Sequence, residues 1–247
     1  MSLIDLANPT RFSNLAGRLL PWLIAATVIA FAVGLYLSAL APDDYQQGAT
    51  VKIMFIHVPN AWLCMFVWGV MSVASLGTLV WRHPLADVAA KTAAPLGAAF
   101  TFLALVTGSL WGRPMWGTYW VWDARLTSVL VLFLMYLGII ALWRTAEDPS
   151  RAARAAAILT LVGAINLPII KFSVDWWNTL HQPASVFRAG GPTIDSSILM
   201  PLLIMAIAFT LLFFTLHLVA MRTELLRRRI RTLRLMQAQG KMAGARA

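Results

Sequence analysis

Charge is scarce in this chain of 247 residues, since only 12% of them are Asp, Glu, Lys or Arg. Soluble domains carry about twice that share, so the composition excludes an ordinary water-soluble globule. A disordered chain is excluded as well, because 60% of the residues are hydrophobic and disorder needs the opposite balance. The composition therefore indicates a protein whose segments are embedded in lipid.

Cysteine is nearly absent: Cys64 is the only one, and it lies within an apolar stretch. One thiol excludes a disulfide within the chain, a CxxC redox pair and the CxxCH motif that attaches c-type haem covalently. Acidic residues are also few, and the formal net charge is +10. Nucleic-acid binders show such a charge, but basic residues that flank apolar spans are orientation signals, so no nucleic-acid partner is expected.

Six uncharged runs are long enough, or nearly so, to cross a bilayer as a helix, which takes about 20 apolar residues. The fifth run is the weakest, because it is short and contains Asn166 and Pro168. Lys171 at its end can extend its charge to the interface. The sequence therefore predicts one all-α, polytopic membrane domain over residues 1–247, built as a bundle of six transmembrane helices. The predicted spans are about 19–42, 58–81, 92–112, 126–143, 155–171 and 196–221.

Basic residues are unevenly shared between the two sides of these spans. Fifteen of the twenty fall on the side that holds both termini. The positive-inside rule therefore predicts cytoplasmic N- and C-termini, with residues 222–247 as a basic cytoplasmic tail. We expect the start of this tail to be a helical extension that lies against anionic lipid. The five basic residues of the other, outer side are Lys52, Arg113, Arg125, Lys171 and Arg188.

Four of the eleven tryptophans gather between residues 111 and 125. A single tryptophan here would be explained by an interfacial aromatic belt. An aromatic belt does not explain the whole cluster, because Gly112, Pro114 and Gly117 are expected to break regular structure there. Such residues would let the backbone approach a ligand closely. Large rigid rings suit a planar aromatic ligand, and stacking adds about 0.5–1.5 kcal/mol per pair. We expect an aromatic shelf formed by Trp111, Trp116, Trp120 and Trp122.

Two of the four histidines, His57 and His181, are also predicted on the outer side, on loops that flank the shelf. Pro59 is expected to open the second helix at its first turn. Neutral imidazoles on opposite faces of a macrocycle are a natural axial pair for haem iron, and ligands on loops could release it. His83 and His217 fall on the cytoplasmic side and are expected to be structural.

Cations of the outer side could bind the two haem propionates. Arg125 is the first candidate, because it adjoins the shelf and arginine pairs well with carboxylates. Lys52 is the second, since it lies shortly before His57. Asp123 could hold Arg125 or accept a hydrogen bond from a ligating histidine. For Arg188, a binding role and a solvated position are equally supported.

Three motifs, in order on one predicted face of the membrane, resemble a known family. Trp111-Gly-x-x-x-Trp116-Gly-x-x-Trp120-x-Trp122-Asp123-x-Arg125-Leu-Thr is similar to the WWD signature of haem-handling membrane proteins. The segments Ile-His57-Val-Pro-x-Ala-Trp62 and Trp176-Trp177-Asn-Thr-Leu-His181-Gln-Pro resemble the branch called heme exporter protein C (CcmC), of system I cytochrome c maturation. The likeness covers nearly the whole chain.

The resemblance implies a protein of the bacterial inner membrane that binds haem at the periplasmic face and delivers it to the haem chaperone CcmE. It implies a periplasmic haem-binding cap on the six-helix bundle, with the periplasmic WWD segment at residues 111–125. It also implies a transiently held haem b with His57 and His181 as axial ligands. The implied partners are CcmE, the ABC transporter subunits CcmA and CcmB, the small membrane subunit CcmD and the lipid bilayer. No side chain is an obvious nucleophile or general base, so an assembly factor that promotes covalent haem loading of the chaperone is favoured over an enzyme.

Three other functions remain open. A transmembrane b-type haem electron carrier would need histidine pairs within the helices, and none lies there clearly. A non-haem permease subunit would need polar residues in mid-span, where the six runs are nearly bare. In a purely structural assembly subunit, the aromatic shelf would be an interaction surface only.

Overall fold

The computed structural model describes residues 7–182, 185, 186, 188 and 190–244, with side chains as far as residue 239. Six helical segments, with α5 and α6 counted as one, are long and apolar enough to cross a membrane. The prediction of an all-α, multi-pass membrane protein is thereby confirmed. In chain order the elements are α1 (Pro9–Leu40), the 3-10 helix η2 (Ala49–Ile53), α2 (Met54–Leu79), α3 (Ala86–Trp116), α4 (Ala124–Thr145), α5 (Pro149–Gly163), α6 (Asn166–Trp176) and α7 (Ser196–Gly244).

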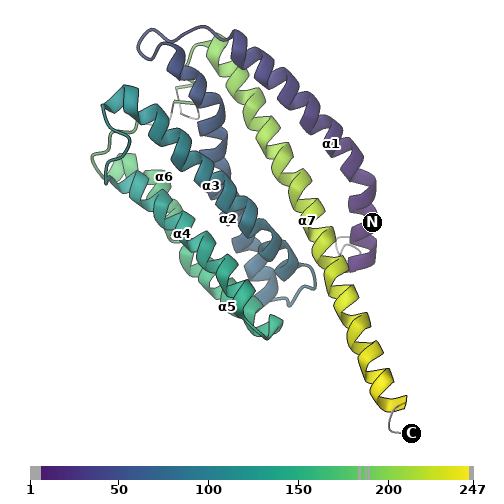
Figure 1. Ribbon diagram of the computed structural model, residues 1–247. Helices are drawn as coiled ribbons and strands as arrows, with labels where there is room; N and C mark the ends of the chain where they lie inside the picture. The colour runs from purple at the N-terminus through teal and green to yellow at the C-terminus, as the bar shows by residue number, and fades with distance from the viewer. Residues whose placement is uncertain (1–6, 183–184, 187, 189, 245–247) are drawn as a thin grey trace.

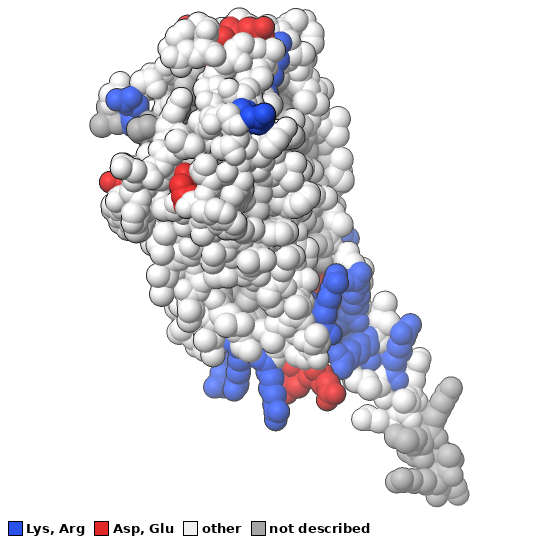
Figure 2. All heavy atoms as spheres, turned by 60° about the vertical axis from the view of Figure 1, so that its left-hand side comes forward, with Lys and Arg blue, Asp and Glu red and all other residues white. Residues whose placement is uncertain are grey.

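The helices run up and down in one bundle (Figure 1). Helices α2 and α3 are central, with α4, α5 and α6 packed on one side of them and α7 on the other, and α1 packs mainly against α7. The α1–α2, α3–α4 and α6–α7 connections lie at one end of the bundle, here called the loop end. Both termini lie at the other, here called the terminal end, where Lys and Arg gather (Figure 2).

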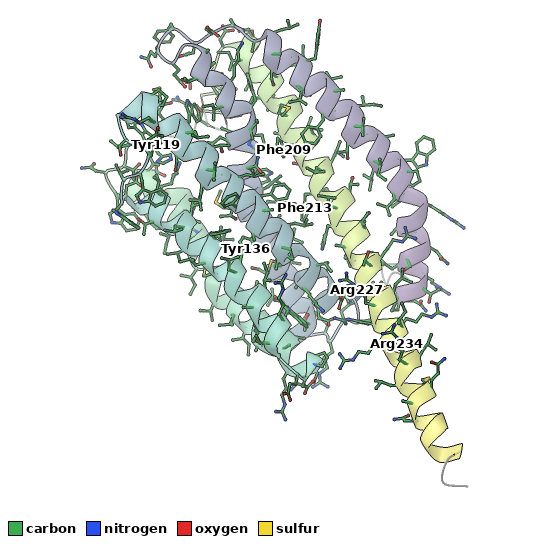
Figure 3. All side chains as sticks on the ribbon, in the orientation of Figure 1. Tyr119, Tyr136, Phe209, Phe213, Arg227 and Arg234 are labelled. Carbon is green, nitrogen blue, oxygen red and sulfur yellow. The ribbon has the colours of Figure 1, made fainter. Side chains whose placement is uncertain are left out.

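The core of the bundle is centred on Trp68 of α2 and Tyr136 of α4, both fully buried. Their rings meet edge to face, with centroids 4.7 Å apart, which is a favourable aromatic geometry. The indole Nε1 of Trp68 donates to the carbonyl of Thr160 at 3.0 Å, and the hydroxyl of Tyr136 donates to that of Cys64 at 2.8 Å. Figure 3 shows Tyr136 within the bundle, on the side that faces the central helices.

Close packing at this core depends on Gly97 of α3, because a Cβ there would overlap the ring of Tyr136. We expect Gly97→Ala to lower the free energy of unfolding by about 1–3 kcal/mol, the usual range for an overpacked core. Gly138→Ala in α4 is the matched control, since a Cβ at that position meets nothing within 4 Å. Thermal unfolding in detergent micelles measures both variants. Equal midpoints for the two would contradict this packing.

Helix α2 begins earlier than predicted, because η2 leads directly into it at Met54. Pro59 therefore lies inside the helix and does not open it. Because proline has no N–H, the carbonyl of Phe55 loses its helical hydrogen bond. Single prolines of this kind are tolerated in spanning helices. His57 is consequently a helical residue, and the expectation that a loop carries it is wrong.

The fifth span is interrupted after α5, and the two residues that weakened its prediction explain the break. Pro168 has no N–H to offer the carbonyl of Ala164, so the helix cannot continue regularly. Around Ile165 the backbone N–H groups donate three residues back, as in a 3-10 turn. Nδ2 of Asn166 donates to the carbonyl of Ser128 in α4 at 2.9 Å, which places the polar amide against a neighbouring helix.

Helix α7 continues past the bundle at the terminal end as a single straight rod (Figure 1). The expected span at residues 196–221 and the described part of the basic tail at 222–247 therefore form one helix. The helical extension is as the sequence predicts. Its axis continues that of the spanning segment (Figure 1).

Candidate functional site

The loop end brings together side chains from three distant parts of the chain. His57 comes from α2, Trp111 and Trp116 from the end of α3, and His181 from the connection between α6 and α7. The ring centroids of His57 and Trp111 are 5.6 Å apart, and those of Trp116 and His181 are 4.8 Å apart. The two histidines are also close enough for an electrostatic interaction. Both imidazoles therefore lie at the same end of the bundle.

His57 is held against α3 through its Nδ1 atom. That atom lies 3.1 Å from the carbonyl oxygen of Ala104 and 3.2 Å from Oγ1 of Thr107. The ring packs on Gly108, where a Cβ would come within 2.9 Å of Cε1. With the proton on Nδ1, the ring donates to the carbonyl and Nε2 keeps its lone pair. No hydrogen bond joins this Nε2 to another of the described residues, so it is available to a metal.

His181 is oriented by a carboxylate. Its Nδ1 lies 3.5 Å from Oδ2 of Asp123, which is long for a hydrogen bond, and neither atom has a hydrogen-bond partner within the described part of the chain. The other carboxylate oxygen of Asp123 accepts from the N–H of Leu126 at 2.8 Å and caps α4. Burial lowers the pKa of His181, Arg125 lowers it further, and Asp123 opposes both. The imidazole is therefore neutral at neutral pH, the form that binds metals.

Half of the aromatic shelf is helical, which corrects the prediction. Helix α3 continues to Trp116, so Gly112 and Pro114 lie inside it and do not break it. Gly112 is needed because the ring of Trp116 lies over it, where a Cβ would come within 2.9 Å of Cε3. Only Gly117 ends the helix, with a left-handed φ of 74° that favours glycine. Trp111 and Trp116 thus face the histidines from a rigid element.

Trp120 and Trp122 follow this turn and form a second pair, with ring centroids 5.5 Å apart. They lie at an apolar groove of about 590 Å³ between α3 and α4, within the usual range for small-molecule sites. Groove residues such as Phe102 and Leu110 are exposed on a spanning helix, so the groove faces lipid. The buried Nε1 of Trp120 has no hydrogen-bond partner among the residues described, which leaves it free to donate to a ligand.

The two cations expected to bind propionates already make contacts within the protein. Arg125 donates from Nε to Oγ of Ser173 at 3.0 Å and from Nη2 to two carbonyl oxygens in the middle of α6, so it ties α4 to α6. Lys52 donates to the carbonyl of Ala39 at 3.2 Å and lies 3.9 Å from a carboxylate oxygen of Asp43. Both residues therefore stabilise the loop end whether or not they also bind a ligand.

The other three outer cations are more exposed. Arg113 lies over the ring of Tyr119, with 5.6 Å from its guanidinium carbon to the ring centroid, and Figure 3 shows Tyr119 at the loop end. Lys171 and Arg188 are exposed to solvent. These three are accessible to an acidic ligand group, although the sequence favoured the less accessible pair.

Two residues at the site, Gln47 and Thr107, were not predicted. Oε1 of Gln47 accepts from Nε1 of Trp111 at 2.9 Å and so fixes a shelf ring. No local pattern marks Gln47, because its partner is 64 positions away in the chain. Thr107 lies one helical turn before Trp111, and this i, i+4 spacing could have placed both on the face of α3 that His57 contacts.

Comparison with known proteins gives a consistent result. A sequence profile described as heme exporter protein C matches residues 2–236. The heme exporter protein C of Bradyrhizobium diazoefficiens is 83% identical over 238 residues, which cover 96% of this chain and 90% of that protein. Those of Escherichia coli K12 and Paracoccus denitrificans are 48% and 46% identical, over 91% and 94% of this chain and 91% and 97% of their own lengths. The chain therefore belongs to the heme exporter protein C family.

Proposed function

We propose that this protein binds haem at the outer, periplasmic face of the bacterial inner membrane and delivers it to the haem chaperone CcmE during maturation of c-type cytochromes. One observation supports this most strongly: His57 and His181 lie at the same loop end, each with Nδ1 near a protein acceptor and with no hydrogen bond from Nε2 to another described residue. Ligating histidines commonly have this arrangement, and two of them suit the axial positions of haem iron. The name of the relatives, heme exporter protein C, agrees with a role in haem handling.

The donor set at the loop end fits haem b better than a bare metal ion. Among the described residues, no group of three or more His, Cys, Asp or Glu side chains could hold a metal ion. Haem needs only axial ligands from the protein, because the porphyrin supplies the equatorial nitrogens. Three of the six buried side-chain atoms that have no hydrogen-bond partner among the described residues belong to this site, and a bound ligand would bring them into tighter contact. They are Nδ1 of His181, Oδ2 of Asp123 and Nε1 of Trp120.

The groove between α3 and α4 supports a lateral path between the lipid and the site, since Trp120 and Trp122 lie on it and its walls are apolar. The two ligands differ in their supports. His57 is fixed on α2 against α3, whereas His181 is carried on a connection. We propose that His181 is the ligand that is withdrawn when haem leaves.

We also propose that the chain works beside CcmA, CcmB and CcmD, with both termini in the cytoplasm. The orientation is supported by the distribution of charge. Lys and Arg gather at the terminal end and along the extension of α7 (Figure 2), and basic residues concentrate on the cytoplasmic side of membrane proteins.

Asp123→Asn should weaken haem binding by about 10- to 100-fold, the usual effect of removing an outer partner of a ligating histidine. Asparagine caps helices as well as aspartate does, so α4 is expected to form normally. Haem titration of the full-length protein in detergent, followed by absorbance, measures the change. Asp148→Asn is the matched control, because Asp148 caps α5 at the terminal end by accepting from Ser150. Equal affinities for both variants would contradict the role of Asp123.

Delivery is tested with the haem-loaded full-length protein and haem-free CcmE. After mixing and separation, haem should be found on the chaperone, and His181→Ala protein supplied with the same amount of haem should transfer much less. An electron carrier would instead keep its haem through oxidation and reduction. Haem that stays on this protein in the presence of the chaperone would contradict delivery.

A further inference from the structure

Beyond the bundle, α7 presents an amphipathic surface, here called the α7 arm (residues 226–239), whose apolar side chains the other described residues leave about half exposed. Three apolar side chains on it share one helix face, because they follow the spacing i, i+4, i+7. They are 57%, 48% and 51% exposed, and these residues, here called the apolar row, are Leu226, Ile230 and Leu233. Three arginines with the same spacing form an adjacent arginine row along a shallow hollow (Figure 3 labels two of them): Arg227, Arg231 and Arg234.

A network of charges fixes the direction in which the α7 arm leaves the bundle. Glu224 of α7 is nearly buried and lies 2.6 Å from Nζ of Lys91 in α3. Arg228 lies 3.2 Å from Glu224 and 2.7 Å from Asp87, which is also on α3. These contacts join α7 to the beginning of α3 at the terminal end. The arm is therefore anchored at its base to the rigid part of the molecule.

No residue allows the arm to bend toward a membrane surface. Helices bend sharply at proline, glycine or bulges, and the only proline within α7 is Pro201, near its beginning. A span of about 20 residues from Ser196 ends before the arm. The predicted span ends at about residue 221, so at about 1.5 Å per residue the apolar row lies about 8–18 Å beyond it along the same axis. An amphipathic helix that inserts into lipid lies in the plane of the interface, so lipid does not cover this row.

We propose that the α7 arm is a docking site for a soluble protein whose surface presents an apolar groove bordered by carboxylates. The apolar row has the anchor spacing of helix-in-groove recognition. Five arginines and no acidic residue lie between 226 and 239, so charge complementarity selects an acidic partner. This inference does not depend on haem binding, since the arm lies at the opposite end of the molecule (Figure 1).

The test uses the full-length protein in its native membranes, with a photo-cross-linking residue in place of Ile230. A matched control carries the same residue in place of Thr232, on the opposite side of the helix. We expect a discrete protein adduct from position 230 and none from position 232, with Asp and Glu in the cross-linked peptide of the partner. Adducts with lipid alone, equal adducts from both positions or no adduct at all would overturn the proposal.

Affinity then tests the chemistry of the contact, with the cross-linked protein purified and the full-length chain in nanodiscs of phosphatidylcholine. The triple substitution Arg227→Glu, Arg231→Glu and Arg234→Glu should weaken binding at least tenfold. Reversing the partner's mapped carboxylates to lysine should restore it. An unchanged affinity would overturn the proposal, and an unchanged melting temperature of the variant would show that its fold is intact.

Discussion

Full-length protein with His57→Gly or His181→Gly should lose most of the haem that co-purifies with it, and imidazole added to the buffer should restore binding. Each substitution removes an axial nitrogen and leaves a space that free imidazole can fill. Loss of an outer partner of a ligating histidine already costs about 10- to 100-fold in affinity, so loss of the ligand itself should cost more. Haem absorbance per protein, with and without reductant, measures the effect.

His83→Gly is the control for this experiment. Its Nδ1 accepts from the N–H of Leu85 at 3.3 Å, far from the loop end, and haem content should stay at the level of the unaltered protein. A glycine within α2 costs about 1 kcal/mol in helix propensity, so His57→Ala is compared as well. Full haem content in the variants at both His57 and His181 would exclude them as ligands.

Replacing Trp120 and Trp122 together by alanine should weaken haem binding by about 10- to 100-fold. Each ring that packs on a planar ligand contributes about 0.5–1.5 kcal/mol beyond the burial of its surface, and the pair borders the groove between α3 and α4. Titration of the purified protein with haem in detergent gives the affinity. Because the iron ligands remain, the absorbance of the bound form should keep its shape while the affinity falls.

Trp81→Ala separates loss of this site from loss of an exposed ring in general. Trp81 is 72% exposed in the connection after α2, and Trp122 is 76% exposed, so the two residues are similarly accessible. Trp81→Ala should leave the affinity for haem unchanged. If the double substitution at positions 120 and 122 also leaves it unchanged, the aromatic pair takes no part in binding.

The arrangement of the bundle was predictable because lipid imposes a simple constraint on sequence. Each spanning helix needs a long apolar run, and an even number of spans returns the termini to one side. One span precedes the beginning of α2 and five spans precede the connection that carries His181. Both numbers are odd, so the two segments must lie at the same end of the bundle. The sequence therefore predicts that His57 and His181 lie at the same end of the molecule.

Details of the site were harder to predict because packing overrides local preferences. Gly112 and Pro114 were expected to break the chain, yet both lie in α3, where the ring of Trp116 covers Gly112. Pro59 lies inside α2 because η2 starts the helix before it. Arg125 ties α4 to α6 through partners nearly fifty positions away. Such contacts depend on tertiary neighbours that no local pattern reveals.

The elements that carry the two histidines also differ from the expectation that both lie on loops, because His57 lies in α2 and only His181 lies on a connection. His57 is held by Ala104 and Thr107 on a neighbouring helix, whereas the imidazole of His181 packs against Trp116 and has the carboxylate of Asp123 3.5 Å from its Nδ1. As the proposed iron ligands, one histidine held between two helices and one carried on a connection would suit the proposed function of binding haem and later releasing it. Rates of haem loss should therefore respond more strongly to substitutions around His181 than to those around Thr107.

Electron paramagnetic resonance of the ferric haem complex tests most directly whether His57 and His181 bind the same iron. The complex of the unaltered full-length protein should give the low-spin signal of two axial imidazoles. His57→Ala and His181→Ala, each loaded with haem, should both give a high-spin signal that free imidazole converts back to low spin. A low-spin signal that persists in either variant without added imidazole would contradict ligation by this pair.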